Sequence, residues 1–143
     1  PQLRENQLLS IICGTNRELF GKLSRRYDAH PNVRVLGLVT DMPRMMHASD
    51  LLLTKPGGLT STEAAAANVP FVAVKAIPGC ETCNAAFFQQ HGMALSARDD
   101  AEAVAFAIQL AIDPERAERM RRAQRETLPA HAARTIAQFV LNQ

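Results

Sequence analysis

The sequence predicts an α/β fold in which a doubly wound, Rossmann-like parallel sheet carries helices on both faces. Short continuous apolar runs recur along the 143 residues, and stretches with helical spacing separate them. Such runs are typical of strands buried on both faces. Strands that alternate with helices pair in parallel and place their crossover helices on the two faces of the sheet. The length suits a single domain over residues 1–143.

The apolar runs predict five strands, and the spacing between them predicts seven helices. The strands are expected within residues 8–13, 33–39, 51–53, 71–74 and 93–95. The first of them, Leu8–Cys13, should be buried on both faces. The helices are expected within residues 16–27, 42–48, 60–67, 80–90, 101–112, 115–127 and 132–141.

Polar side chains mark several of the predicted helix ends. Asn16, Asp41 and either Asp99 or Asp100 stand where N-caps are expected, and Asn68 stands at a C-cap. Within the helix over 101–112, Val104, Ile108 and Ile112 share one face.

Four loops leave the carboxyl ends of predicted strands, at residues 14–16, 39–41, 56–60 and 77–80. Crossovers between parallel strands are right-handed, so these loops should share one edge of a single sheet. Ligands of such sheets bind at that edge.

The stretch Leu51–Ala67 is the central motif of the chain, because its sequence predicts a strand, a glycine turn and a helix in succession. A helix that begins behind Gly57 and Gly58 presents unpaired N–H groups to an anion. A second interpretation is purely structural. Thr60 or Ser61 can cap the helix. Thr60 and Glu63 have the spacing of a capping box, in which Glu63 bonds back to the Thr60 N–H.

Composition excludes several functions. The formal net charge is only +2, aromatic residues make up 5% and Trp is absent, so we expect no nucleic-acid partner. No apolar run reaches the roughly 18 residues of a membrane helix. Three cysteines do not make a disulfide framework, which favours the reducing cytosol. Position 1 is Pro, close to the first strand, so we expect a fragment of a longer protein.

The loops lack the common nucleotide signatures. Gly14 stands alone where a dinucleotide-binding fingerprint needs three glycines, and Lys55 precedes the glycines of the third loop instead of following them. What remains is a glycine turn at a helix start with Glu63 one turn inside. That arrangement suits a pyrophosphate on the N–H groups and a ribose diol on the carboxylate, as in a nucleoside diphosphate.

Three of these loops carry characteristic segments, which follow one another along the chain. They are Val39–Met42, Thr54–Ala64 and Ile77–Ala85. Together they resemble the C-terminal half of GT-B glycosyltransferases of the monogalactosyldiacylglycerol synthase and processive diacylglycerol glycosyltransferase type. These enzymes are related to the transferase that adds GlcNAc to the lipid-linked muropeptide. The likeness runs from about Leu8 to about Leu95.

The resemblance implies a UDP-sugar-binding domain of an enzyme that transfers galactose or glucose to a lipid such as diacylglycerol. It places eight residues at the nucleotide and diphosphate, namely Gly14, Leu38, Val39, Gly57, Gly58, Leu59, Thr60 and Glu63. It places Cys80, Glu81 and Asn84 at the donor sugar. At Cys80 much of the family is expected to carry Gln, and a thiol is the poorer hydrogen-bond donor.

Further expectations follow from the resemblance. The catalytic base and the acceptor site belong to an N-terminal half that is absent here, so the fragment alone should be inactive and carry no catalytic residue. The UDP-sugar is a substrate, and we expect neither a cofactor nor a metal. The full-length protein should be cytoplasmic and peripheral to the membrane.

Two features support other interpretations. Cys80 and Cys83 form a C-x-x-C motif at a helix start, which suits a thiol-redox or regulatory module, or half of a zinc site. The arginine-rich helix over 115–127 is typical of a solvated face, and it also suits contact with anionic lipid headgroups.

Overall fold

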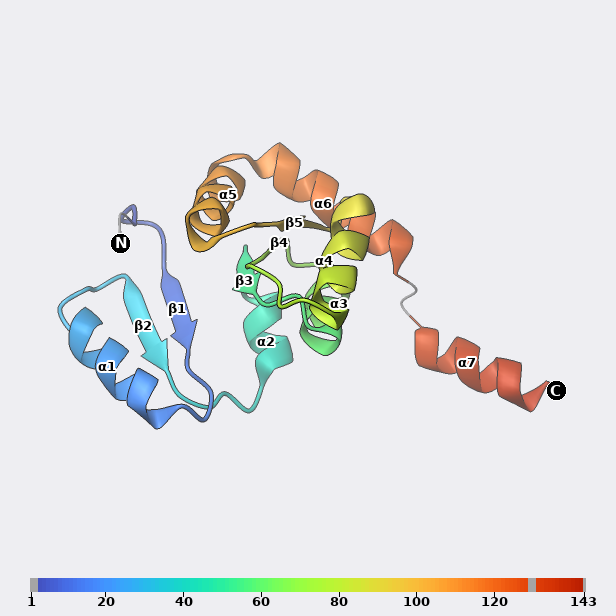
Figure 1. The fold of residues 1–143 in the computed structure, drawn as a ribbon, viewed down its shortest axis with the longest axis horizontal. Helices are drawn as coiled ribbons and strands as arrows, with labels where there is room; N and C mark the ends of the chain where they lie inside the picture. Colours follow the sequence, from blue (N-terminus) through green and yellow to red (C-terminus); the bar gives the residue numbers. More distant parts are fainter. Residues whose placement is uncertain (1–2, 129–130, 143) are drawn as a thin grey trace. The chain divides into compact units, whose positions relative to one another are not determined.

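A computed structural model describes residues 3–128 and 131–142 of the chain. The chain divides into two compact units, Pro1–Met42 and Pro43–Gln143 (Figure 1). Each unit contains its own parallel sheet, with two strands in the first and three in the second.

The first unit consists of β1 (Leu9–Ile12), α1 (Arg17–Tyr27) and β2 (Val33–Leu36). The two strands pair in parallel, with Leu9 opposite Val33. The predicted cap of α1 is confirmed, because the Asn16 Oδ1 accepts the backbone N–H of Leu19 at 2.9 Å.

The expected burial of the first strand on both faces is wrong. All of β1 is half-buried or exposed, and Ile12 is 36% exposed. Within the first unit β1 has one neighbouring strand, β2, and α1 lies mainly against β2, so only part of the surface of β1 is covered. A continuous apolar run therefore indicated a strand but overestimated its burial.

The second unit alternates strands and helices and then continues in helices alone. Its elements are α2 (Met42–His47), β3 (Leu52–Thr54), α3 (Gly58–Ala66), β4 (Phe71–Ala73), α4 (Cys80–Gln90), β5 (Ala94–Ser96), α5 (Asp100–Ile112), α6 (Pro114–Thr127) and α7 (Ala132–Leu141). The strands follow the order β3-β4-β5, and every pair is parallel.

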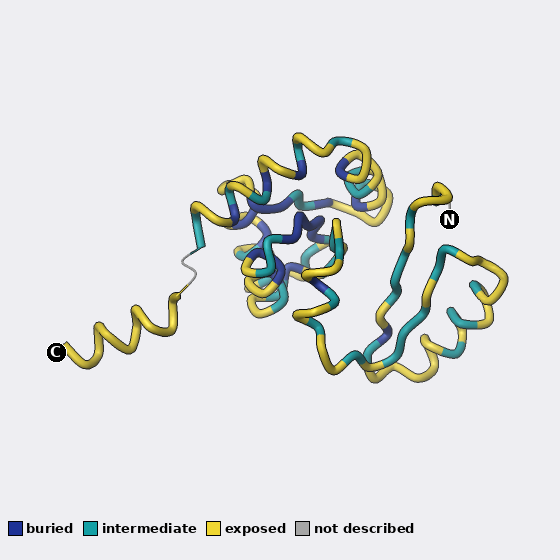
Figure 2. Tube along the Cα trace, turned by 180° about the vertical axis from the view of Figure 1, so that it is seen from behind, coloured by how far each residue is buried: buried dark blue, intermediate teal, exposed yellow. Residues whose placement is uncertain are grey.

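The core of the second unit lies on both faces of β4, which is buried along its whole length (Figure 2). Successive strand residues point to opposite faces. Phe71 and Ala73 pack with a cluster from α3 and α4 that includes Ala64 and Phe88. Val72 packs on the other side with residues of α5 and α6, namely Ala103, Leu110 and Met120. The predicted α/β fold with helices on both faces of a parallel sheet is confirmed for this unit.

The expectation of one continuous sheet with four loops on a single edge is not met, because the strands form two separate sheets. The loops over 14–16 and 39–41 follow β1 and β2, and the loops over 56–60 and 77–80 follow β3 and β4. Alternation of strands and helices specifies parallel pairing, but it does not specify which strands are neighbours. Two loops therefore share an edge within each unit.

Gln124 of α6 fixes this helix against the sheet in a way that the sequence did not indicate. Its side chain is 1% exposed, and its Nε2 donates to the carbonyls of Val69 and Met93 at 2.9 and 3.0 Å. Those carbonyls precede β4 and β5, so one amide satisfies two backbone acceptors at the amino ends of neighbouring strands. Buried carbonyls without such partners would destabilise the fold.

Two further predicted helix ends agree with the structure to within one residue. Asn68 follows the C-cap of α3 with a φ of 58°, a left-handed conformation that Asn tolerates better than most residues. Asp99 caps α5 by accepting the N–H of Glu102 at 2.8 Å. Asp113, which was not predicted as a cap, caps α6 because its Oδ1 accepts a hydrogen bond from the N–H of Arg116 at 2.8 Å.

The aligned apolar residues of α5 do not face the core. Val104, Ile108 and Ile112 are 54–57% exposed. This helix is apolar on more than one side, and the side that packs on the sheet carries Ala103 and Leu110. In α7 all described residues are exposed. Among the described residues no helix is long and apolar enough to cross a membrane.

Candidate functional site

The candidate site lies at the carboxyl edge of β3 and β4. These strands are parallel neighbours, with Thr54 opposite Ala73, and the Val74 N–H donates to the Thr54 carbonyl at 2.9 Å. The loop over 55–57 leads from β3 into α3, and the loop over 74–79 leads from β4 into α4. Both helices therefore begin at the same edge of the sheet, where ligands of parallel sheets bind.

Helix α3 begins directly on the glycines, without a side-chain cap. Gly57 is the N-cap with an extended backbone, and no side chain accepts a hydrogen bond from the first turn. The N–H groups of Gly58, Leu59 and Thr60 belong to this first turn, and the first backbone bond of the helix is that of Ser61 N–H to the Gly57 carbonyl at 3.0 Å. Uncapped N–H groups at a helix start, with the positive end of the dipole, favour an anion.

The capping-box interpretation of Thr60 and Glu63 is wrong. Gly57 takes the cap position, so Thr60 lies inside the first turn and cannot cap the helix. The helix starts earlier than predicted because Gly57 and Gly58 fit the cap and first helical positions, where glycine is well tolerated.

Glu63 is thereby released from any capping role. It is exposed on α3, and no side-chain hydrogen bond or ion pair of Glu63 is found among the described residues. It lies one turn after Leu59 and Thr60, so it shares a face with the uncapped first turn. Leu59 on that turn is 81% exposed.

The first turn of α4 holds the two loops in place. The Glu81 carboxylate accepts the N–H of Ile77 at 2.8 Å, and the Asn84 Nδ2 donates to the Pro56 carbonyl at 3.0 Å. Gly79, which precedes this turn, has a φ of 116° that favours glycine. In this structure Glu81 and Asn84, which were predicted to face a donor sugar, brace the two loops at the carboxyl edge of β3 and β4.

The two cysteines of the C-x-x-C motif lie on the same turn. Cys80 and Cys83 are exposed free thiols. Cys80 is the first residue of α4, next to Glu81, and Cys83 precedes Asn84. In the part of the chain that the structure describes, no group of three or more His, Cys, Asp or Glu residues could hold a metal ion.

The remaining predicted nucleotide residues belong to the first unit. Gly14 follows β1 with a φ of 58° and is half-buried. Leu38 is 69% exposed and Val39 is half-buried, in the loop that follows β2. Because β1 and β2 are parallel neighbours, these residues share the carboxyl edge of their own sheet.

Sequence reasoning missed Ser61, which was considered only as a helix cap. Its side chain is fully buried, and its Oγ has no hydrogen-bond partner among the described residues. It lies on the same face of α3 as the buried Ala64 and Ala65. That spacing of small residues was visible in the sequence and could have indicated a close-packed helix face.

Comparison with protein families places residues 1–127 in a match to the model described as glycosyl transferases group 1. Among curated proteins, the processive diacylglycerol beta-glucosyltransferase of Bacillus pumilus is 32% identical over 134 residues, which cover 93% of this chain and 35% of that protein. The protein of the same name from Staphylococcus carnosus is 38% identical over 109 residues, 76% of this chain and 28% of that one. The chain thus spans about a third of the length of these relatives.

Solved structures show the same fold. Acinetobacter baumannii MurG matches with a TM-score of 0.63 and 20% identity, over 99% of this chain and 51% of that one. The calicheamicin glycosyltransferase CalG4 matches with a TM-score of 0.65 and 22% identity, over 99% of this chain and 44% of that one. A Streptomyces glycosyltransferase, SsfS6, solved with thymidine diphosphate, matches with a TM-score of 0.55 and 20% identity, over 96% of this chain and 42% of that one.

Proposed function

Because the chain belongs to the glycosyl transferases group 1 family, we propose that it is the part of a glycosyltransferase that binds the nucleotide-sugar donor. One observation carries the proposal: α3 begins on Gly57 with no side-chain cap, at the carboxyl edge of the sheet and beside the loop that enters α4. An anionic ligand at that point would meet N–H donors that no side chain among the described residues caps.

In the proposed complex the diphosphate of the donor accepts hydrogen bonds from the N–H groups of Gly58, Leu59 and Thr60. The Glu63 carboxylate accepts hydrogen bonds from the ribose hydroxyls. It shares a helix face with that turn and has no competing partner among the described residues. Gly57 is the cap that leaves the amides open. Gly14, Leu38 and Val39 are assigned to the nucleotide by resemblance to the family, and their part stays a prediction.

The sugar is assigned to the first turn of α4. Glu81 and Asn84 are already fixed by their bonds to Ile77 and Pro56, so the turn is preorganised before the donor binds. Cys80 is exposed at the start of the same turn. In this proposal the UDP-hexose is a substrate, and neither a metal nor a cofactor takes part.

The proposed reaction of the whole protein is transfer of a hexose, glucose or galactose, from UDP to a lipid acceptor such as diacylglycerol. The names of the curated relatives support this acceptor. The acceptor site and the base that activates it are assigned to protein outside this chain. We propose that the whole protein works at the cytoplasmic face of the membrane, bound peripherally, and has no nucleic-acid partner.

Calorimetric titration of the chain with UDP and with UMP tests donor binding. If the α3 amides hold the diphosphate, UDP should bind at least about tenfold more tightly than UMP, because the added phosphate gains charge-assisted bonds. Equal affinities for the two nucleotides, or no binding of either, would contradict the proposal. Repeating the titration after alkylation of the exposed thiols tests the alternative redox role, in which Cys80 and Cys83 and not nucleotide binding define the function.

A further inference from the structure

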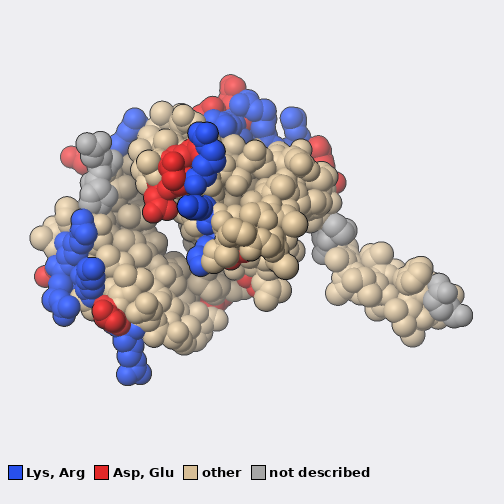
Figure 3. Space-filling model, in the orientation of Figure 1, with Lys and Arg blue, Asp and Glu red and all other residues tan. Residues whose placement is uncertain are grey.

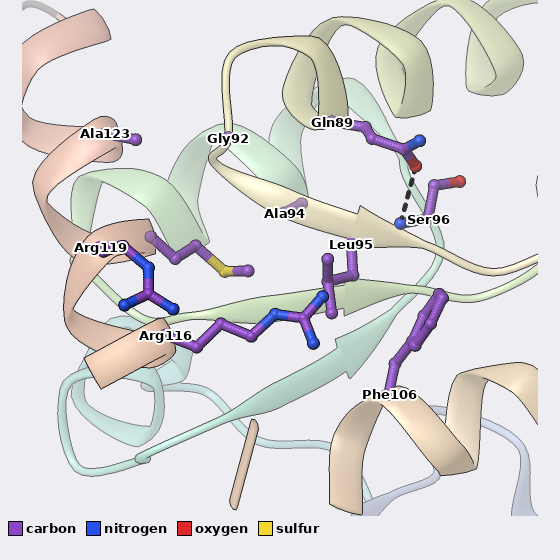
Figure 4. Close-up of a pocket in the computed structure, with 10 residues that line it drawn as sticks. Gln89, Gly92, Ala94, Leu95, Ser96, Phe106, Arg116, Arg119 and Ala123 are labelled. Atoms are coloured by element: carbon purple, nitrogen blue, oxygen red, sulfur yellow. Dashed lines mark hydrogen bonds between the residues drawn. The ribbon is translucent and has the colours of Figure 1, made fainter. Parts of the chain in front are cut away.

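A pocket of the second unit lies away from the candidate donor site, along the edge strand β5. It has a volume of about 370 Å³, near the lower end of the range for small-molecule sites. Its walls come from β5, α5, α6 and the end of α4 (Figure 4). Leu95, Phe106 and Met120 supply apolar surface to it.

The pocket exists because β5 has no neighbouring strand on one side. The strand order is β3-β4-β5, and the Ala97 N–H donates to the Ala73 carbonyl at the end of β4. The N–H of the preceding residue, Ser96, points to the outer edge, where the Gln89 Oε1 accepts it at 3.1 Å (Figure 4). A side chain thus satisfies one N–H of the strand edge, and a pocket instead of another strand lies beside β5.

Two arginines line this apolar pocket. Arg116 and Arg119 are three residues apart on α6 and both line the pocket. The Arg116 side chain extends from the helix toward Leu95 of β5, and the Arg119 side chain lies beside α6 (Figure 4). Arg116 donates to the neutral Gln109 Oε1 at 3.1 Å. Arg119 lies 3.8 Å from Glu115, in a pair whose side chains are 58% and 88% exposed. Such a long, exposed pair neutralises little charge.

The other charges of α6 are arranged differently. In Figure 3 basic and acidic side chains gather together over α6. Arg125 donates to Glu118 at 2.8 Å, and Arg121 lies 3.6 Å from the same carboxylate. Glu118 therefore pairs with arginines outside the pocket. Of the two pocket arginines, Arg119 has only the long, exposed pair with Glu115, and Arg116 bonds the neutral Gln109. Two like charges at one site favour an anion between them.

We propose that this pocket binds a phosphate-bearing amphiphile, with the phosphate on Arg116 and Arg119 and an apolar portion against Leu95, Phe106 and Met120. Guanidinium groups bind phosphate oxygens with paired, charge-assisted hydrogen bonds. The apolar walls suit a ligand that also carries an apolar portion, which inorganic phosphate lacks. A membrane phospholipid and a soluble phosphorylated metabolite with an apolar group share this chemistry.

Titration of the chain with three probes tests the site: dihexanoyl phosphatidic acid below its micelle concentration, inorganic phosphate, and uncharged dihexanoylglycerol. Phosphatidic acid should bind most tightly of the three. The double variant Arg116→Gln/Arg119→Gln should bind phosphatidic acid at least about tenfold more weakly than the parent does. The matched control, Arg122→Gln, changes an exposed arginine of the same helix that does not line the pocket, and it should bind as the parent does.

Further arms separate the two possible sources of the ligand and test the apolar half. Shortening both acyl chains from six carbons to four should weaken binding, because each fully buried methylene contributes about fourfold in affinity. Tighter binding to anionic vesicles than to the monomeric lipid would identify a membrane source, and equal binding would identify a soluble one.

Two results would contradict the proposal. If inorganic phosphate bound as tightly as phosphatidic acid, the ligand would need no apolar portion. If Arg122→Gln lost as much affinity as the double variant, the pocket would not be the binding site. UDP affinity of the double variant should equal that of the parent.

Discussion

Replacing Asn84 with Ala tests whether this residue braces the candidate site in the absence of any ligand. The substitution removes the Nδ2 donor that bonds the Pro56 carbonyl at 3.0 Å. Pro56 is fully buried, so its carbonyl loses a partner in a largely water-free environment. An unsatisfied buried acceptor costs about 1–3 kcal/mol, and half-burial of Asn84 lets some water in. We therefore expect the free energy of unfolding to fall by about 1–2 kcal/mol.

Urea denaturation of the parent and the variant measures this change through the midpoint, provided that the m-value stays constant. The control is Gln90→Ala, which removes an exposed amide from the same helix and should change stability by less than about 0.5 kcal/mol. If Asn84→Ala unfolds at the same urea concentration as Gln90→Ala, the bond to Pro56 does not hold the loop. Asn84 would then matter only once a sugar is bound.

Three further predictions concern α6, α5 and the dithiol. Gln124→Met keeps the side-chain size and removes the donor to Val69 and Met93, together with a buried Oε1 that has no partner among the described residues, so it should cost about 1–3 kcal/mol in urea denaturation. Hydrogen bonding to Arg98 lowers the pKa of the Glu102 carboxyl below its usual range. A pKa that is lowered in the folded state stabilises the fold at pH values above the ordinary pKa of Glu. The stability difference between the parent and Glu102→Gln should therefore be full at pH 7 and vanish as the pH falls below about 4. Elemental analysis of protein purified without added metal should find no zinc at Cys80 and Cys83.

Much of the second unit was predictable because its sequence signals were local. The apolar run at Phe71 and the spacing of the flanking helices agreed on a parallel sheet, and Asp99 and Asn68 marked helix ends correctly. Cap chemistry depends on a few neighbouring residues, so a sequence can carry it in full. Which strands pair is a long-range property, and for this reason the separation into two sheets was not visible in the sequence.

At the candidate site the start of α3 on the glycines was predicted correctly, and the predicted cap was wrong. Gly57 and Gly58 correctly marked a helix start at the edge of the sheet, but the choice of Thr60 as the cap failed because glycine itself fits the cap position. The hydrogen bond between Asn84 and Pro56 joins residues 28 apart in sequence, so no local sequence pattern predicts it. The same holds for Gln124, whose two acceptors lie 55 and 31 residues away.

The most direct test of donor binding at α3 is the UDP affinity of Glu63→Gln, measured by calorimetry together with the melting temperature. Glu63 is exposed and caps no helix, so its replacement should leave the melting temperature unchanged. Glutamine keeps the shape but loses the charge and one acceptor oxygen, and charge-assisted bonds contribute about 1.5–3 kcal/mol each. We predict that UDP binds at least about tenfold more weakly to Glu63→Gln, while Glu126→Gln, an exposed acid on α6, binds as the parent does. UDP binding of parental affinity to a folded Glu63→Gln variant would contradict the proposed ribose contact.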